Sequence, residues 1–199
     1  MACNARLPWL ALLGVPVLGA AQAPPIDHAA PARYAMINAL GAPNPNPAMG
    51  TEARTFDRLV GTWDCTFTFY LEDGSVRKKT GKLLVGWIMD GRAVQDIWVT
   101  YQNSQKDSTV GTSLRFFDTQ LKQWRVVFVS PQYNYLVTVQ GGMEGDRIVL
   151  HGVDTDGLPI RWSFNEMTGD SFTWRGEKSH DGGKTWKLEE EHHMTRHGG

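Results

Sequence analysis

The sequence predicts an all-β protein: an antiparallel, up-and-down β-barrel of about ten strands, preceded by a short N-terminal helix. Three observations carry this prediction. From residue 61 onward, strand-like runs alternate with turn signals roughly every dozen residues. The loops between them are short, so neighbouring strands must be antiparallel, because parallel pairing needs a long crossover. Gly61 and Trp63 open the first strand, where Gly permits a sharp bend and Trp can plug the closed end of a barrel.

Ten runs are expected as strands, and each ends at a turn rich in Gly, Asp, Asn or Ser. Gly141-Gly142 is expected to be one such turn, and Asp181-Gly182-Gly183 another. Closing the meander into a barrel removes exposed edges and leaves an interior that can hold a small ligand. The expected strands are residues 62–71, 76–89, 92–101, 109–117, 123–130, 133–140, 147–153, 158–165, 171–179 and 184–195.

The N-terminus has the features of a secretory signal peptide, residues 1–21. Arg6 supplies the positive flank, and Leu7–Ala20 is an apolar run too short to span a bilayer. Pro24 would obstruct cleavage after Ala23, so cleavage after Ala21 is preferred. The mature chain then keeps only Cys65 and cannot form an internal disulfide. A periplasmic or extracellular location, in a bacterium, is therefore expected.

Residues 22–50 are rich in Pro, Ala and Asn and are expected to be a largely disordered linker. One helical turn is expected around residues 33–40. Thr51 is expected to cap a short helix that includes Phe56 and Leu59 and precedes the first strand. The barrel itself is expected to occupy residues 51–196.

Composition excludes some partners. The chain has 20 basic and 21 acidic residues, so no basic surplus exists to attract nucleic acid or anionic lipid. No membrane span is expected. The chain has eight Trp, and many of them must lie inside the fold or at an interface. The protein is expected to be a monomer or a homodimer.

These elements resemble the calycin superfamily of lipocalins, fatty-acid-binding proteins and nitrobindins. Gly61-x-Trp63 matches the lipocalin signature, and Arg196 is placed to stack on Trp63 as the basic residue does in lipocalins. The chain is more closely similar to an uncharacterised bacterial lipocalin-like family of unknown function. The matching segments are residues 86–92, 114–118 with Trp124-Arg125, and 179–186. The resemblance implies a barrel with a cavity and no particular reaction, because fold does not determine function.

Strand alternation gives two faces but leaves open which one lines the cavity. Trp63, Cys65, Phe67 and Phe69 share a face that is expected to point inward. In later strands, one face carries the charges and the other the aromatic rings. Either the aromatic faces are inside and the charges form exposed cross-strand pairs, or the charges line the cavity and bind a polar ligand. A mixed cavity is preferred. The charged residues in question are Asp96, Arg115, Arg161, Arg175 and Glu177.

No catalytic or metal motif is found in the sequence, so whether the protein is an enzyme stays open. His192 and His193 are adjacent on one strand and cannot chelate one metal together. No cofactor is expected. The resemblance to nitrobindins leaves haem, bound through His192 or His193, as a minor alternative. Residues 179–186 resemble an aspartate-box turn and are interpreted as a hairpin, and Cys65 as an inert buried thiol.

The sequence thus predicts a secreted or periplasmic barrel that binds a small, partly apolar ligand. The alternatives are an enzyme acting on a small polar substrate in the same cavity, and an interaction module with an exposed aromatic face. The expected ligand-binding residues are Trp63, Phe67, Phe69, Trp87, Trp98, Arg115, Trp124, Trp174, Arg175 and Trp186.

Overall fold

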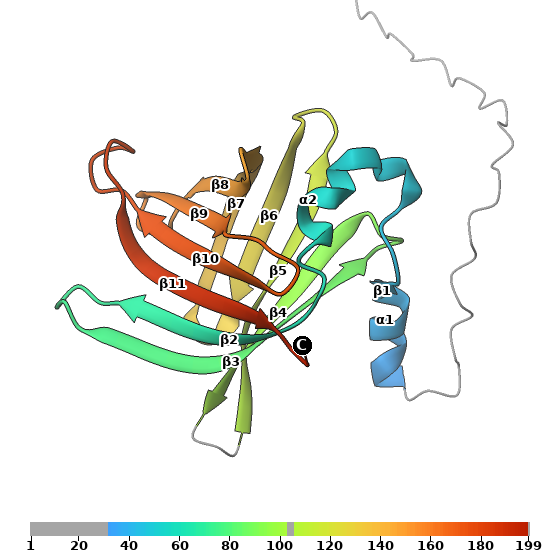
Figure 1. Ribbon diagram of the computed structural model, residues 1–199, viewed down its shortest axis with the longest axis horizontal. Helices are drawn as coiled ribbons and strands as arrows, with labels where there is room; N and C mark the ends of the chain where they lie inside the picture. The colour runs from blue at the N-terminus through green and yellow to red at the C-terminus, as the bar shows by residue number, and fades with distance from the viewer. Residues whose placement is uncertain (1–31, 103–105, 199) are drawn as a thin grey trace, which may run out of the picture.

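A computed structural model describes residues 32–102 and 106–198 and shows a closed antiparallel barrel of ten strands (Figure 1). Each strand pairs with the next one in the sequence, including β3 with β4, and pairing of the last strand, β11, with the first, β2, closes the barrel. The predicted all-β, calycin-like barrel is confirmed. The barrel strands are β2 (Gly61–Tyr70), β3 (Val76–Ile88), β4 (Ala93–Gln102), β5 (Lys106–Asp118), β6 (Gln123–Ser130), β7 (Tyr135–Glu144), β8 (Arg147–Val153), β9 (Pro159–Asn165), β10 (Ser171–Lys178) and β11 (Lys187–Arg196).

The strand boundaries agree with the sequence within a few residues, with one clear difference at Gly141-Gly142. These glycines do not form a turn, because β7 continues to Glu144 and the chain turns at Gly145 instead. Gly141 lies where two strands approach closely: a Cβ added there would lie 2.1 Å from the Val149 carbonyl oxygen. The glycine signal therefore marks a close backbone approach inside the sheet.

The segment before the barrel has the helical turn expected around residues 33–40 and further elements that were not expected. It contains helix α1 (Ala32–Leu40), the two-residue strand β1 (Gly41–Ala42) that pairs with β3, the 3₁₀ helix η1 (Pro47–Ala53) and the single turn α2 (Arg54–Asp57). Pro47 is tolerated because it occupies the first helical turn, where its missing N–H is not needed. The predicted cap at Thr51 is wrong, because Thr51 lies inside η1 and α2 follows Ala53, which makes no side-chain capping bond. Asn46 caps η1 by accepting from the Ala48 N–H at 3.0 Å. The predicted signal peptide lies outside the described residues.

The helical segment closes one end of the barrel, opposite the β2–β3 and β10–β11 hairpins (Figure 1). Phe56 and Leu59 from this segment are fully buried. The Phe56 ring meets Trp124 edge to face at 4.8 Å and Phe164 at 5.8 Å. We call this closed end the floor of the barrel. Because apolar burial is the main favourable term in folding, the floor contributes strongly to stability.

Trp63 lies in the floor with no exposed surface, and its Nε1 donates to the Leu59 carbonyl at 2.8 Å. The Arg196 guanidinium stacks on its ring at 4.1 Å, which confirms the predicted cation–π contact. Arg196 also donates to the Val60 and Gly169 carbonyls. Gly61 is required here because its φ is +136° and a Cβ would lie 2.6 Å from Arg196 Nη1.

The first strand has the predicted inward face. Trp63, Cys65 and Phe67 are buried, while Asp64 and Thr66 between them are exposed. Burial raises the pKa of the Cys65 thiol to about 12, so the thiolate needed for reaction is scarce at neutral pH. No helix within the described ranges is long and apolar enough to cross a membrane.

The loop between β10 and β11 is held by the side chain of Asp181. Its Oδ1 accepts from the Lys184 and Thr185 N–H groups at 3.0 and 2.8 Å, and its Oδ2 accepts from the Thr185 hydroxyl at 2.6 Å. The Thr185 hydroxyl, with these backbone donors, lowers the pKa of Asp181 to about 2. The aspartate-box-like motif is thus a structural turn, as predicted.

Candidate functional site

Above the floor, the barrel encloses a cavity of about 480 Å³ that opens at the end where the β2–β3 and β10–β11 hairpins lie. Every strand from β2 to β11 contributes at least one residue to its lining. The parts of the strands that pack on the floor do not line it. The walls are mainly aromatic, and polar groups are concentrated at the deep end and at the mouth. A cavity of this size and composition is typical of small-molecule sites.

Three Trp residues on different strands form a continuous wall of this cavity. The Trp174 ring lies 6.0 Å from Trp98 and 5.7 Å from Trp162, in edge-to-face geometry. Phe67 extends the wall on the Trp98 side at 5.8 Å, and Phe128 extends it on the Trp162 side at 6.0 Å. Rings fixed against each other in this way present flat apolar surfaces that suit a ring-bearing ligand.

An ion pair between Asp96 and Arg115 lies at the deep end of the cavity. Both side chains are about 2% exposed, and Asp96 also accepts from the Ser113 N–H at 2.8 Å. The Arg115 guanidinium lies over the Phe56 ring of the floor at 4.8 Å. Burial lowers the pKa of Arg115, and the adjacent Asp96 carboxylate opposes that shift by favouring the charged form. The pair is formally neutral as a unit.

His192 lies in the cavity lining among aromatic rings. Its imidazole stacks on Trp174 at 4.9 Å and meets Phe67 edge-on at 5.1 Å, and its Nε2 is 3.0 Å from a Glu190 carboxylate oxygen. Its Nδ1 is buried and has no partner among the described residues. Haem ligation through His192 or His193 stays a prediction. His193 points to the outer face, near the Thr173 hydroxyl.

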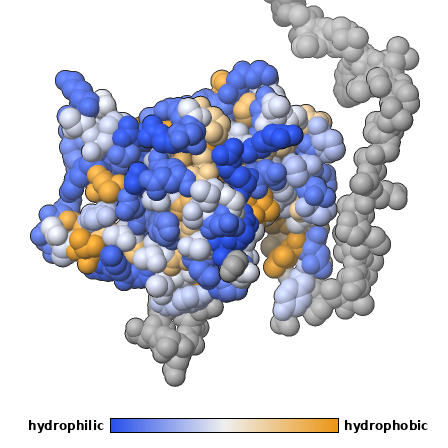
Figure 2. All heavy atoms as spheres, viewed as in Figure 1, coloured by the Kyte–Doolittle hydropathy of each residue, from blue (hydrophilic) through white to orange (hydrophobic). Residues whose placement is uncertain are grey.

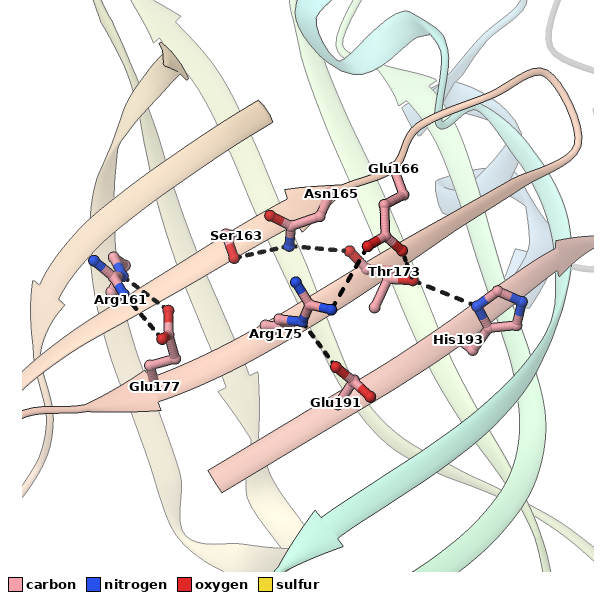
Figure 3. A network of polar contacts seen from close by, with 9 residues as sticks. All are labelled: Arg161, Ser163, Asn165, Glu166, Thr173, Arg175, Glu177, Glu191 and His193. Carbon is pink, nitrogen blue, oxygen red and sulfur yellow. Dashed lines mark hydrogen bonds and ion pairs between the residues drawn. The ribbon is translucent and has the colours of Figure 1, made fainter. Parts of the chain in front are cut away.

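The outer face of β9, β10 and β11 carries a ladder of ion pairs (Figure 3). Arg161 donates twice to Glu177, at 2.8 and 2.9 Å, and Arg175 donates to Glu191 at 2.8 Å. The opposite faces of β9 and β10 carry Trp162 and Trp174 into the cavity. The aromatic faces of these two strands therefore point inward and their Arg residues outward, while β5 points Arg115 inward. The preferred mixed cavity matches this arrangement.

The structure places the ten sequence-predicted site residues in three groups. Five line the cavity: Phe67, Phe69, Trp98, Arg115 and Trp174. Three are buried in the core and do not line it: Trp63, Trp87 and Trp124. Two lie outside the barrel: Arg175 in the ion-pair ladder, and Trp186 in the β10–β11 hairpin under the Arg161 guanidinium at 4.5 Å. Whether the five cavity residues contact a ligand stays a prediction.

Several lining residues were not among the predicted ones. Trp162 could have been included, since it alternates with the outward Arg161 and shares a face with Phe164. Asp96 could also have been included, because it shares a face with Trp98. Nothing local marks Phe128, Tyr135 or Lys79 as lining residues, because their positions depend on strand register around the whole barrel.

The sequence matches no protein family and no curated protein. Among solved structures, the fold is similar to the S-type phycobiliprotein lyase CPES from Guillardia theta, with a TM-score of 0.53 and 11% identity over 72% of this chain and 90% of that one. It is also similar to Rv2717c from M. tuberculosis, with a TM-score of 0.52 and 11% identity over 77% and 99% of the two chains. At this identity the likeness concerns the fold alone: the neighbours are calycin-like barrels.

Proposed function

We propose that this chain is an exported barrel protein that binds a small, partly apolar ligand in its cavity, and that it belongs to an uncharacterised bacterial lipocalin-like family. The observation that carries the proposal is the aromatic cavity of about 480 Å³. Filling it with side chains would have added packing energy, as in the floor, so a cavity lined by three Trp is a cost to stability that ligand binding would offset.

The distribution of Trp supports binding inside the barrel over an aromatic interaction surface. None of the Trp residues in the described part of the chain is exposed. In Figure 2 the visible face is mostly hydrophilic, with hydrophobic residues in small separate patches. Scattered patches of this kind are normal on a soluble surface and need no partner.

The test is a fluorescence titration with N-phenyl-1-naphthylamine, a neutral ring-bearing dye. We expect saturable one-site binding that quenches Trp emission. Trp174→Leu and Trp98→Leu should weaken binding by about tenfold, because each removes a wall contact worth about 1–2 kcal/mol. Trp186→Leu, on the outside of the barrel, is the matched control and should bind as the wild type does. Absence of saturable binding would remove the proposal.

Export is tested separately by N-terminal sequencing of protein recovered from the culture medium or periplasm of a bacterial host. The mature chain should begin near Gln22. Full-length protein in the cytoplasm would contradict export and leave the binding proposal unaffected.

A second candidate is an enzyme that acts on a small polar substrate in the same cavity. The observation that favours it is the His192 imidazole held by Glu190 at 3.0 Å on the cavity lining, an arrangement that can move a proton. Turnover of a bound compound that falls about a hundredfold in His192→Gln, with unchanged affinity, would support catalysis.

A further inference from the structure

The charges around the cavity are unevenly partnered. Four acidic residues of the lining have cationic or imidazole partners. Asp96 pairs with Arg115, Asp154 with Lys178 at 2.6 Å, and Glu190 with the His192 ring at 3.0 Å. Glu177 borders the cavity, but its carboxylate pairs with Arg161 at 2.8 Å in the outer ladder. Glu189 is the remaining acid of the lining, and it lies near Lys178. At the mouth, Lys178 therefore offsets Asp154 and lies near Glu189, while Glu190 faces the His192 imidazole.

Two cations of the lining have no such partner. Arg77 and Lys79 lie on β3 two residues apart, so both point to the cavity side of the strand. Neither makes an ion pair or a hydrogen bond with any residue in the described ranges. Arg77 is exposed, and its charge helps to lower the pKa of Asp73 in the β2–β3 turn. Lys79 is half-buried. Because Lys79 borders the cavity, an anionic group placed there would face its ammonium and gain a charge-assisted contact.

Strand register fixes where these cations lie relative to the aromatic walls. Arg77 pairs with Phe69 and Lys79 with Phe67 across β2. On the other side of β2, the same two Phe residues pair with Glu190 and His192. The cationic and acidic sides of the mouth are thus two strand spacings apart, about 10 Å. The ion pair at the deep end is internally neutralised and leaves no free charge there.

We propose that the cavity selects an amphipathic anion: a ligand with a flat apolar body and one carboxylate- or sulfonate-like group. The body lies between Trp98 and Trp174, and the anionic group lies at the mouth against Arg77 and Lys79, away from Glu189 and Glu190. This inference rests on the proposed function, because it names the ligand class of the same cavity. It also assigns a direction of binding, with the apolar end innermost.

Two dyes with the same ring system test the proposal. 1-Anilinonaphthalene-8-sulfonate is anionic, and N-phenyl-1-naphthylamine lacks the sulfonate. Wild type should prefer the sulfonate. In Arg77→Gln/Lys79→Gln that preference should fall by about tenfold or more, because two charge-assisted contacts are lost, while the affinity for the neutral dye stays within about twofold.

The matched control is Lys78→Gln/Lys82→Gln, which removes two charges from the other face of the same strand, outside the cavity lining. It should leave both affinities unchanged. Equal loss of sulfonate binding in this control, or an unchanged preference in Arg77→Gln/Lys79→Gln, would overturn the inference while the binding proposal survives. Failure of both dyes to bind wild type would remove both.

Discussion

The two halves of the barrel interior are built from the same residue types and behave differently. In the floor, the indole N–H groups of Trp63 and Trp87 donate to the Leu59 carbonyl and the Asp57 carboxylate, and the rings pack to near-zero exposure. Trp124 is packed as closely, although its buried N–H has no partner among the described residues. In the cavity, the N–H groups of Trp98, Trp162 and Trp174 donate to no described residue, and the rings surround open space. The difference arises because η1 and α2 fill only one end of the barrel. The floor stabilises the fold, and the other end is left for a ligand.

The largest effect should come from the floor. Trp63→Ala should lower the free energy of unfolding by about 3–5 kcal/mol, because it opens a cavity in a closely packed site and removes the Arg196 contact. Urea denaturation measures this. Trp98→Ala, in the cavity wall, should cost less than half as much. Equal losses at the two positions would show that the interior is uniformly packed.

The ion pair at the deep end should come next. Asp96→Asn should cost about 3 kcal/mol, because it leaves the buried Arg115 without its counter-charge. Arg175→Gln, in the half-exposed outer ladder, should cost less than about 1 kcal/mol. A small loss for Asp96→Asn would mean that Arg115 reaches water through the cavity. Denaturant unfolding of both variants decides between these outcomes.

Arg196→Met should have an intermediate effect of about 1–2 kcal/mol, since it removes the cation–π contact and the hydrogen bonds that tie the end of β11 to the floor. Thermal or denaturant unfolding measures it. Because Arg196 lies far from the mouth, dye affinity should be unchanged. Loss of dye binding in this folded variant would mean that the floor and cavity are coupled.

The smallest expected effect is the loss of stability of the β10–β11 hairpin at acid pH. The pKa of Asp181 is about 2 in the fold and near 4 in an unfolded chain, so the ionised form stabilises the β10–β11 hairpin above pH 4. That contribution should disappear as the pH falls from about 4 toward 2. Amide hydrogen exchange in the hairpin should therefore quicken over this range in wild type. In Asp181→Asn, hairpin exchange should not quicken over this pH range. If wild type and Asp181→Asn respond to acid identically, the acid response belongs to another carboxylate.

The sequence was sufficient for the strands and the floor, because both depend on local patterns. Alternation and turn residues placed all ten strands, and Gly61, Trp63 and Arg196 identified the closed end. In the segment before the barrel, a helical turn was expected around residues 33–40, where α1 lies, but β1 and η1 were not predictable, because the sequence does not show that β1 pairs with β3.

Which face of each strand points into the barrel was harder to predict, because hydrophobicity alone does not decide it. In β9 and β10 the aromatic face is inside, as hydrophobicity suggests. In β5 the rule fails: Arg115 is buried while Phe116 is 41% exposed. The reason is the pairing of β4 with β5, which brings Asp96 beside Arg115 and neutralises it. Such a partner becomes visible only when the strands are assembled.

The most direct test of a ligand-binding cavity above a packed floor is a proton–nitrogen correlation spectrum of the protein, in which each Trp indole N–H gives its own signal. On titration with N-phenyl-1-naphthylamine, the signals of Trp98, Trp162 and Trp174 should shift together and saturate at one equivalent. Those of Trp63 and Trp87 should stay in place, because their N–H groups are held in the floor. Shifts confined to Trp186 or to the floor, or no shift at all, would contradict the account.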